Sequence, residues 1–506
     1  MTNVEKWSLF ELSFEGPSEG NPFTEHHLEG QFQNTGEAVH CEGFYDGKGI
    51  YKIRFMPSFT GEYHYAVTAD FLPETMTGSF FSTEPSENNH GPVRVAYNYH
   101  FAYEDGSPYY SVGTTCYVWN HQSDELIAQT LSSLREAGFN KLRFCVFPKH
   151  FDYNLNEPYS YPYEGTPMDS GVLTDTNFKD YDGDKGGNHF DKTRFNPEHF
   201  RRIEYCIAEL QKAGIEADLI MMHPYDRWGF SCMTHEEDAL YWNYCIARFS
   251  AYRNVWWSLA NEYDILSAKT LKDWEFYADL LVQKDPWHHL RSIHHCIHQY
   301  DYSRPWITHC SLQRHPQVTS EYREKYGKPV VLDEMSYEGD IPWPWGNITG
   351  EEMVRRFWET AVRGGYPGHG ETYLRHHETN DASSREILWW SHGGKLQGES
   401  WKRIRFLYEI MKEIPGHGLK PDKDMFGILV ASPEREYTDI KSCYLVYYGN
   451  LQPSQGVVQF DQDTLFQVQL IDTWNMTIRE MGVHSGWIKI DMPGRPYMAL
   501  RLIRKS

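Results

Sequence analysis

Two apolar stretches of the sequence end in acidic side chains that could work as a pair. Residues 255–260 read Val-Trp-Trp-Ser-Leu-Ala and end in Asn261 and Glu262, and residues 329–333 lead directly into Glu334. Apolar runs of this length that stop at polar residues are typical of strands buried on both faces. Two carboxyl groups held a few ångströms apart can divide a hydrolytic reaction between them, one as general acid and base and the other as nucleophile. Glu262 and Glu334 are therefore the predicted catalytic pair.

The elements around these two stretches predict how the pair is brought together. From residue 96 to residue 415, expected strands alternate with expected amphipathic helices, which is typical of a parallel α/β domain. We expect strands at residues 109–119, 141–147, 216–223, 255–262, 291–295, 306–312, 330–334 and 366–373, and helices at residues 124–137, 197–213, 236–252, 271–284, 319–326, 351–364 and 400–413. This alternation predicts a (β/α)₈ barrel, in which the C-terminal ends of all strands meet at one mouth. The fourth and seventh strands face each other across such a barrel, so both glutamates are expected at that mouth.

Short strands are expected on both sides of this barrel. The first 95 residues alternate apolar and polar side chains in short segments separated by turn residues such as Asp46-Gly47 and Thr60-Gly61, which predicts an antiparallel β-sandwich. From about residue 421 to residue 506 similar short strands return and predict an all-β domain. The predicted fold is therefore α/β, with a TIM barrel at residues 96–415, an N-terminal β-sandwich at residues 1–95 and a C-terminal all-β domain at residues 421–506.

Further polar residues at the expected strand ends are candidate substrate-binding residues. Arg143 lies in the second expected strand, and His223 and His309 end the third and the sixth. Arg143 either contacts substrate or pairs with Glu334, and its charge would lower the pKa of that carboxyl. Asn261 either contacts substrate or caps the following helix. The two histidines are either site residues or hydrogen-bonded histidines of the core.

Aromatic side chains are unusually frequent, and several follow expected strands. They make up 16% of the residues, with 17 Trp and 35 Tyr, and such side chains stack against sugar rings while their polar tips stay hydrated. They either line a sugar subsite or pack loops. The candidates for sugar contact are Trp119, Trp228 and Trp343, with Trp345, Trp389 and Trp390 close to the same expected mouth. Glu371, near the eighth strand, is a candidate acceptor for a sugar hydroxyl.

The arrangement resembles that of the clan A retaining glycoside hydrolases, whose (β/α)₈ barrel carries Asn-Glu at the end of strand four and Glu at the end of strand seven. The resemblance implies that Glu262 is the acid/base, that Asn261 binds the sugar 2-hydroxyl, and that Glu334 is the nucleophile of a retaining enzyme. We expect the bond to be of β type, and the expected intracellular location favours small oligosaccharides or glycosides over polymers. Within this clan, residues 96–415 are most similar to the apiosidase-like glycoside hydrolases, and residues 471–477 and 493–497 are similar to the β-domain that often follows that barrel. Apiosidases themselves do not present this Asn-Glu pair, so the resemblance does not imply specificity for apiose.

Charge and composition argue against several classes of partner. The formal net charge of −22 argues against nucleic acid and anionic membranes, since both require a basic face. No apolar run approaches the ~20 residues of a membrane-spanning helix. The nine cysteines form no C-x-x-C pair and no signal peptide is recognised, so we expect a cytoplasmic protein. The sequence contains neither a P-loop nor G-x-G-x-x-G, so no cofactor is expected, and it leaves open whether the chain forms a homo-oligomer.

Two other functions stay open at this point. A metal-dependent hydrolase could use the same barrel, but no two of the 25 histidines are two residues apart, so the His-x-His that opens many such sites is missing. A catalytically inactive barrel that binds carbohydrate is the second alternative. The long segment 151–193 contains Asp180, Asp182, Asp184 and Asp191, which form either a calcium loop with a displaced glycine or part of an aromatic lid over the sugar site.

Overall fold

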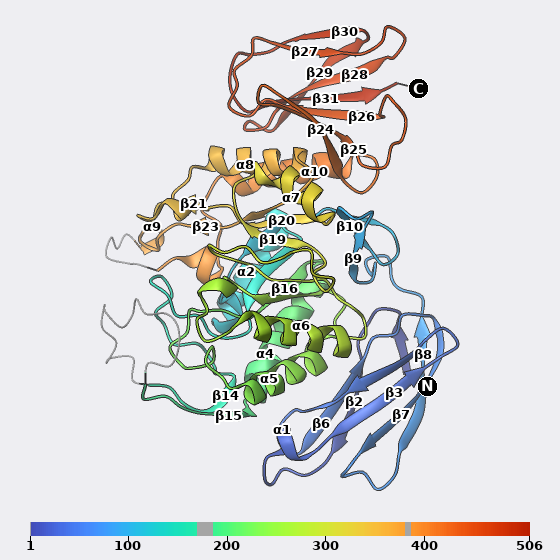
Figure 1. Ribbon diagram of the computed structural model, residues 1–506, viewed down its shortest axis with the longest axis vertical. Helices are drawn as coiled ribbons and strands as arrows, with labels where there is room; N and C mark the ends of the chain where they lie inside the picture. The colour runs from blue at the N-terminus through green and yellow to red at the C-terminus, as the bar shows by residue number, and fades with distance from the viewer. Residues whose placement is uncertain (1, 169–185, 380–385, 506) are drawn as a thin grey trace.

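The structure is a computed structural model that describes residues 2–168, 186–379 and 386–505. Strands from the start of the chain, a central barrel of strands and helices, and strands from the end of the chain follow one another along the longest axis of the molecule (Figure 1). The predicted α/β fold, a TIM barrel between two all-β regions, is confirmed. The domain boundaries drawn from the sequence stay a prediction.

Eight strands of the described residues form the parallel sheet of the barrel. In barrel order they are β12 (Gly113–Thr115), β13 (Lys141–Cys145), β16 (Glu216–Met222), β17 (Val255–Ala260), β18 (Arg291–Ser292), β19 (Cys310–Gln313), β20 (Val330–Glu334) and β22 (Tyr366–His369). A parallel bridge between His294 and Ser311 closes the barrel between β18 and β19. The fourth and seventh strands, β17 and β20, therefore end at one mouth.

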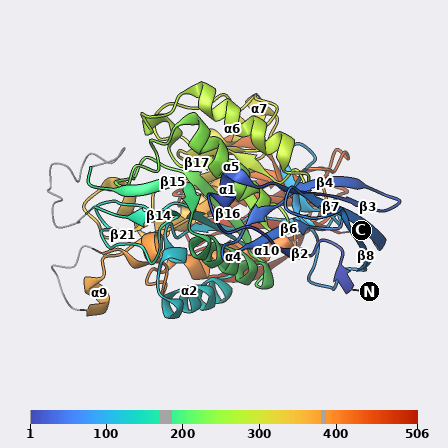
Figure 2. The same ribbon diagram turned by 90° about the horizontal axis from the view of Figure 1, so that it is seen from below.

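Helices surround this sheet, and their ends follow local sequence signals. The helices are α2 (Asp124–Ala137), α4 (Pro197–Lys212), α5 (His235–Phe249), α6 (Leu271–Lys284), α7 (Val318–Tyr326), α8 (Gly350–Val362) and α10 (Ser400–Lys412). The Ser123 side chain accepts from the amide of Leu126 and begins α2, and Gly138 at φ 76° ends it, because glycine adopts this left-handed conformation without steric cost. Seen from below, α6 and α7 lie on one side of β16 and β17, and α2 and α4 lie on the other (Figure 2).

A buried ion-pair cluster ties three barrel strands together. Lys141 of β13 donates to Asp218 of β16 and to Asp333 of β20, each at 2.7 Å. Ser311 of β19 donates to the second oxygen of Asp333 at 2.5 Å. Because both oxygens of Asp333 accept from side chains of other barrel strands, its role is structural, whereas the adjacent Glu334 lines the mouth.

The N-terminal region is a β-sandwich. One sheet joins β1 (Thr2–Glu5), β8 (Met76–Thr83), β7 (Gly61–Ala69), β3 (Leu28–Gln33) and β4 (Ala38–Glu42), and the other joins β2 (Phe10–Glu15), β6 (Ile50–Phe55) and β5 (Phe44–Tyr45). Phe32 and Phe55, one from each sheet, stack with ring centroids 4.6 Å apart in its core. Arg54 fastens the sandwich to the barrel by donating to Glu204 of α4 at 2.6 Å.

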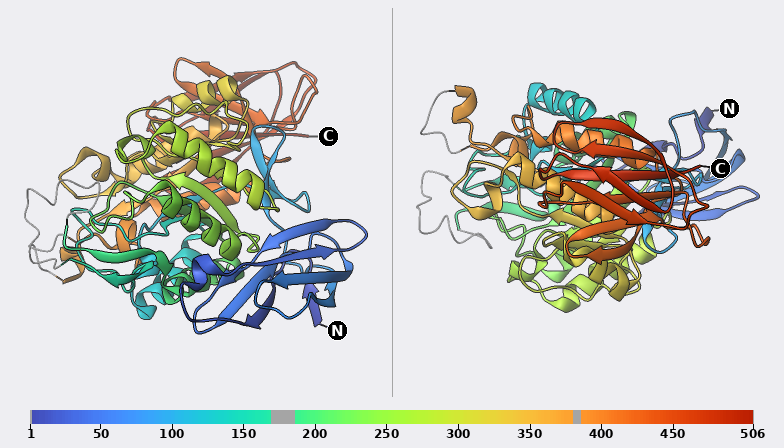
Figure 3. Two further views of the ribbon diagram at one scale, coloured as in Figure 1. Left: turned by 60° about the horizontal axis from the view of Figure 1, so that its bottom comes forward. Right: turned by 90° about the horizontal axis from the view of Figure 1, so that it is seen from above.

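The C-terminal region is also all-β. One sheet joins β24 (Leu419–Met425), β25 (Ile428–Pro433), β26 (Cys443–Tyr447), β31 (Met498–Arg504), β28 (Phe466–Asp472) and β29 (Thr477–His484), and β27 (Gln455–Gln459) pairs with β30 (Trp487–Asp491). Trp358 of α8 stacks on Tyr447 of β26 at 5.5 Å, which packs this region against the barrel. Figure 3 shows the N-terminal and C-terminal strands on separate sides of the barrel.

Smaller elements lie in the N-terminal and barrel regions. They are α1 (Pro22–Glu25), β9 (Val93–Ala96), β10 (His100–Tyr103), β11 (Pro108–Tyr109), β14 (Tyr163–Thr166), β15 (His189–Phe195), β21 (Glu338–Gly339), β23 (Glu371–Thr372) and α9 (His376–Thr379). Phe101 of β10 packs against Trp256 and Tyr366 at the N-terminal ends of their strands, which places β10 at the end of the barrel opposite the mouth. Among the described residues, no helix combines the length and the apolar character that spanning a membrane requires.

Candidate active site

A cavity of about 460 Å³ lies at the mouth of the barrel and contains both predicted catalytic glutamates. Glu334 is the last residue of β20, and Glu262 follows β17 by two residues. Both side chains are nearly buried, with 5% of Glu262 and 8% of Glu334 exposed. Aromatic side chains line the same cavity, namely Tyr117, Phe151, Tyr225, Tyr337, Trp345 and Trp390. The cavity size is within the ~300–1,000 Å³ common for small-ligand sites.

Glu334 is held by two donors from the first two barrel strands. The hydroxyl of Tyr117, just after β12, donates to its Oε1. Arg143 of β13 donates from Nη1 to the same oxygen at 3.3 Å. Arg143 is 1% exposed, and its positive charge supplies the partner that a buried carboxylate requires. One oxygen of Glu334 is thus fixed, and the side chain still lines the cavity.

Glu262 lies in different surroundings. The hydroxyl of Tyr225 donates to its Oε2, Asn261 donates to that oxygen at 3.2 Å, and Gln313, with its amide nitrogen turned inward, donates to Oε1 at 3.1 Å. Burial, followed by repulsion from the negative charge of Glu334, raises the pKa of Glu262 to about 7, against the lowering effect of Tyr225. Its backbone is left-handed, with φ 52° and ψ 53°, a strained conformation that clusters at functional sites.

Asn261 connects the two carboxyl groups. Its amide nitrogen donates to Glu262, and its amide oxygen accepts from Arg143 at 2.8 Å and lies 3.4 Å from the Tyr117 hydroxyl oxygen. Arg143 and Tyr117 both donate to Oε1 of Glu334. A single amide side chain therefore lies between the partners of the two glutamates and sets their relative position.

Two predicted histidines lie outside this cavity. His223 directly follows β16, but its Nε2 lies 3.3 Å from the carbonyl oxygen of Phe147, and burial lowers its pKa to about 3, so it is a neutral core residue. The prediction that His309 lies at the C-terminal end of the sixth strand is wrong. Because β19 begins at Cys310, His309 precedes the strand and lies at the end of the barrel opposite the mouth. Its ring centroid is 5.3 Å from that of Trp256 in that layer.

The tryptophans that were predicted to contact sugar are also placed elsewhere. Trp119 is fully buried in the main core, edge-on to Phe144 at 5.6 Å. Trp228 is 1% exposed and packs against Phe230. Neither Trp119 nor Trp228 is among the described aromatic residues that line the cavity. Trp343 does not line it either, since it lies in the loop after β21 and is 52% exposed. Trp345 and Trp390, which were named beside them, do line it.

Glu371 is a structural acceptor. It is 1% exposed, and it accepts from the backbone amide of Gln397 at 2.8 Å. Glu371 belongs to β23, which pairs with β21 through Glu338. Its carboxyl group therefore fixes the loop of Gln397, which precedes α10, to this strand pair. The prediction that Glu371 accepts a sugar hydroxyl is not supported by this placement.

Sequence reasoning missed several cavity residues, because they lie in loops without a recognisable pattern. Tyr117, Lys149 and Tyr225 each follow a barrel strand by two to four residues. The sequence signal that could have identified them is their position just after a strand, since such residues converge on the mouth of a barrel. Gln313 and Arg314, at the end of β19, line the cavity for the same reason.

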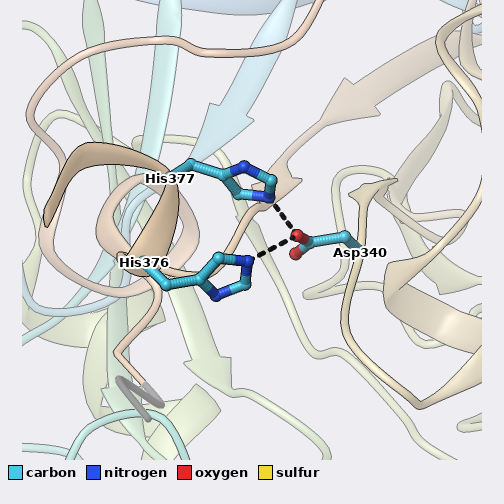
Figure 4. A group of neighbouring side chains, drawn as sticks. All are labelled: Asp340, His376 and His377. Carbon is cyan, nitrogen blue, oxygen red and sulfur yellow. Dashed lines mark hydrogen bonds and ion pairs between the residues drawn. The ribbon is translucent and has the colours of Figure 1, made fainter. Parts of the chain in front are cut away.

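One group of described side chains could hold a metal ion, and it lies outside the cavity. His376 and His377 of α9 both point toward Asp340, and Nε2 of His376 is 3.7 Å from Oδ2 of the aspartate (Figure 4). None of these three described residues lines the cavity of the two glutamates. The predicted calcium ligands Asp180, Asp182 and Asp184 lie outside the described residues, and Asp191 accepts from the amide of Thr193 at 3.0 Å.

Comparisons with known proteins agree with this fold. Residues 96–415 match the apiosidase-like catalytic domain family, residues 3–70 match a domain of unknown function called DUF5060, and residues 433–503 match another called DUF5605. A protein of Bacteroides vulgatus, described as a candidate glycoside hydrolase, is 34% identical over 100% of both chains, with a TM-score of 0.88. A family 5 glycoside hydrolase of the same organism is 15% identical over 83% of this chain and 94% of its own, with a TM-score of 0.59, which reflects a shared fold. No curated protein matches the chain.

The apiosidase-like match covers more than half of the chain, so the chain belongs to the apiosidase-like family. It is accordingly a glycoside hydrolase with a TIM-barrel fold.

Proposed function

We propose that this glycoside hydrolase cleaves a β-type O-glycosidic bond in small oligosaccharides with retention of configuration. The observation that carries the proposal is that two glutamates share one cavity in opposite surroundings. Glu334 contacts a buried arginine, whereas burial and the neighbouring charge raise the pKa of Glu262 to about 7. Two carboxyl groups in unlike environments are suited to the separate roles of nucleophile and acid.

The reaction follows from these two roles. In the first step the Glu334 carboxylate attacks the anomeric carbon, while protonated Glu262 gives its proton to the leaving oxygen, and a glycosyl ester forms at Glu334. In the second step ionised Glu262 takes a proton from water, and the water oxygen attacks the anomeric carbon and releases the Glu334 carboxylate. Each inversion at the anomeric carbon reverses the other, so the product keeps the configuration of the substrate.

The remaining cavity residues suit a sugar ring. Asn261, whose amide lies between the partners of both acids, is the proposed ligand of a sugar hydroxyl beside the anomeric carbon. Trp345 and Trp390, with ring centroids 5.4 Å apart, offer apolar faces against which a pyranose can pack. A cavity of about 460 Å³ favours small glycosides over an extended polymer lying in a long groove.

The product's configuration tests this proposal. A panel of 4-nitrophenyl glycosides of both anomeric series, neutral and acidic, identifies a cleaved substrate. Proton NMR during the first minutes of its hydrolysis then reports the first anomer released. We expect a β-glycoside to give the β-anomer first. Release of the α-anomer would contradict the double-displacement mechanism, and carbohydrate binding without cleavage of any panel member would favour a catalytically inactive barrel.

A further inference from the structure

A buried lysine lies in the cavity beside the two glutamates. Lys149 follows β13 by four residues and is 4% exposed, and it lines the cavity. Its Nζ lies over the ring of Tyr117 at 3.5 Å, that of Tyr225 at 4.2 Å and that of Trp390 at 4.6 Å. These contacts with aromatic faces stabilise a cation and hold the ammonium group at one place in the cavity wall.

Within the described residues, no carboxylate oxygen lies within 4.0 Å of the Lys149 ammonium group. Lys141, the other buried lysine of β13 and its loop, contacts two aspartates at 2.7 Å each. The pKa values of these two lysines differ accordingly. Burial lowers the pKa of Lys149 to about 8, whereas the charges of Asp218 and Asp333 raise that of Lys141. The negative charges of Glu262 and Glu334 act to raise the pKa of Lys149 from beyond ion-pair distance and offset its burial only in part. A buried ammonium without a contacting counter-ion is costly, which points to a partner that arrives with the ligand.

A second cation lines the same cavity without a carboxylate contact among the described residues. The Arg314 guanidinium donates to the backbone carbonyl oxygens of Gln313 at 2.9 Å and Ile297 at 3.2 Å. The cavity therefore contains two cationic groups in a chain whose formal net charge is −22. Because Glu334 already contacts Arg143, this positive charge exceeds what the nucleophile requires.

We infer that Lys149 binds an anionic group on the sugar that occupies this cavity, and that the substrates are acidic glycosides, with a uronic acid carboxylate as the partner of the ammonium group. The inference rests on the proposed function, since it assigns the substrate class of the same cavity. A sugar phosphate presents the same negative charge to Lys149, and the experiment separates the two sources.

The test compares matched substrates. Wild-type enzyme, Lys149→Met and Lys149→Arg are assayed on 4-nitrophenyl β-glucuronide against β-glucoside, on the galacturonide against the galactoside, and on the 6-phosphoglucoside. Methionine retains an apolar chain over the three rings and removes the charge. We expect wild-type kcat/KM to be higher for an acidic substrate than for its neutral partner, by on the order of 10- to 100-fold. Lys149→Met should reduce that ratio to about one through KM, and Lys149→Arg should restore part of it.

Two outcomes of this kinetic assay would overturn the inference. The first is a wild-type preference for neutral glycosides. The second is an equal loss by Lys149→Met on acidic and neutral substrates together with a shifted pH profile, which would show that Lys149 acts only on the charge of Glu262. Preference for the 6-phosphoglucoside over the glucuronide would keep the anion-binding role but overturn the uronic acid.

Failure of the proposed reaction is distinguished by a binding measurement. Titration calorimetry with free glucuronate and with glucose reports the anion subsite without any cleavage. If the wild-type protein binds glucuronate, Lys149→Met does not, and no glycoside is hydrolysed, then the inference about Lys149 stands and the proposed function fails. If glycosides are cleaved with retention but glucuronate is bound no better than glucose, the proposed function stands and the inference fails.

Discussion

Arg143 donates from Nη1 to Oε1 of Glu334 across 3.3 Å, and both side chains are almost fully buried. This contact joins the second and seventh strands at the mouth of the barrel. Arg143 also donates to Asn261, which follows the fourth strand, so one guanidinium group contacts both Glu334 and the residue next to Glu262. The position of Glu334 in the cavity therefore depends on Arg143.

Replacing Arg143 should impair the nucleophile. Arg143→Met removes the charge beside Glu334 and leaves a buried carboxylate without its cation, a loss on the order of 3–5 kcal/mol when such a pair is broken. We expect kcat/KM to fall by at least about 100-fold, which corresponds to ~2.7 kcal/mol of transition-state stabilisation. Arg135→Met, on the exposed surface of α2, is the control and should leave kcat/KM unchanged. Near-normal activity of Arg143→Met would contradict this role.

The pH dependence should report Glu262. Its pKa is raised to about 7, so the acid form dominates below that pH and kcat/KM should fall as pH rises through about 7. The Tyr225 hydroxyl lowers this pKa by hydrogen bonding to the carboxylate, so Tyr225→Phe should move the alkaline limb to higher pH. Tyr263→Phe, whose hydroxyl donates instead to the carbonyl of His298, is the control. A limb that stays in place or moves to lower pH in Tyr225→Phe would refute the assignment.

The two buried lysines should respond oppositely to the same substitution. Lys141→Met leaves the carboxylates of Asp218 and Asp333 without their shared cation, which should destabilise the barrel by about 3–5 kcal/mol. Lys149→Met removes a buried charge that has no carboxylate partner among the described residues, and the thermal midpoint should not fall. Thermal unfolding followed by tryptophan fluorescence compares them. Equal destabilisation would contradict the distinction between a structural lysine and a ligand-binding one.

Activity should not depend on the cluster of Asp340, His376 and His377. None of these described residues lines the cavity that contains Glu262 and Glu334. EDTA treatment, and the variant His377→Ala, should therefore leave kcat/KM on the identified glycoside within about twofold of the untreated wild type. The metal-dependent alternative predicts the opposite result, namely a loss on EDTA treatment that a divalent cation reverses.

Helices and long strands of the barrel could be predicted because their signals are local. Ser123 and Gly138 mark the ends of α2, and the helix spans the predicted residues 124–137. The bounds of the shortest strands could not be predicted. The expected strand 109–119 shrinks to the three residues of β12, and the expected strand 291–295 to the two residues of β18. The sixth strand was predicted too early because Trp306 and Ile307 are buried in a loop, and burial alone does not distinguish a loop from a strand.

The same limits apply to the site. The position of Glu262, Asn261 and Glu334 at one cavity could be predicted, because acidic and amide residues at the ends of buried strands meet at one mouth. The choice among the tryptophans could not be predicted, because Trp119 packs on Phe144 and Trp228 on Tyr161, and both contacts join segments that are far apart in the sequence. Lys149 and Tyr225 likewise reach the cavity only through the folded loops that carry them. The cytoplasmic location and the oligomeric state stay predictions from the sequence.

The most direct measurement of the central claim is azide rescue of Glu334→Gly. The variant removes the proposed nucleophile and leaves space for a small anion in the cavity. On the 4-nitrophenyl β-glycoside that the wild type cleaves, we expect turnover to fall by on the order of 10⁴-fold or more. Sodium azide should restore part of it and yield the α-glycosyl azide. Wild-type turnover by Glu334→Gly, or a rescued product that retains the β configuration, would contradict the assignment of Glu334.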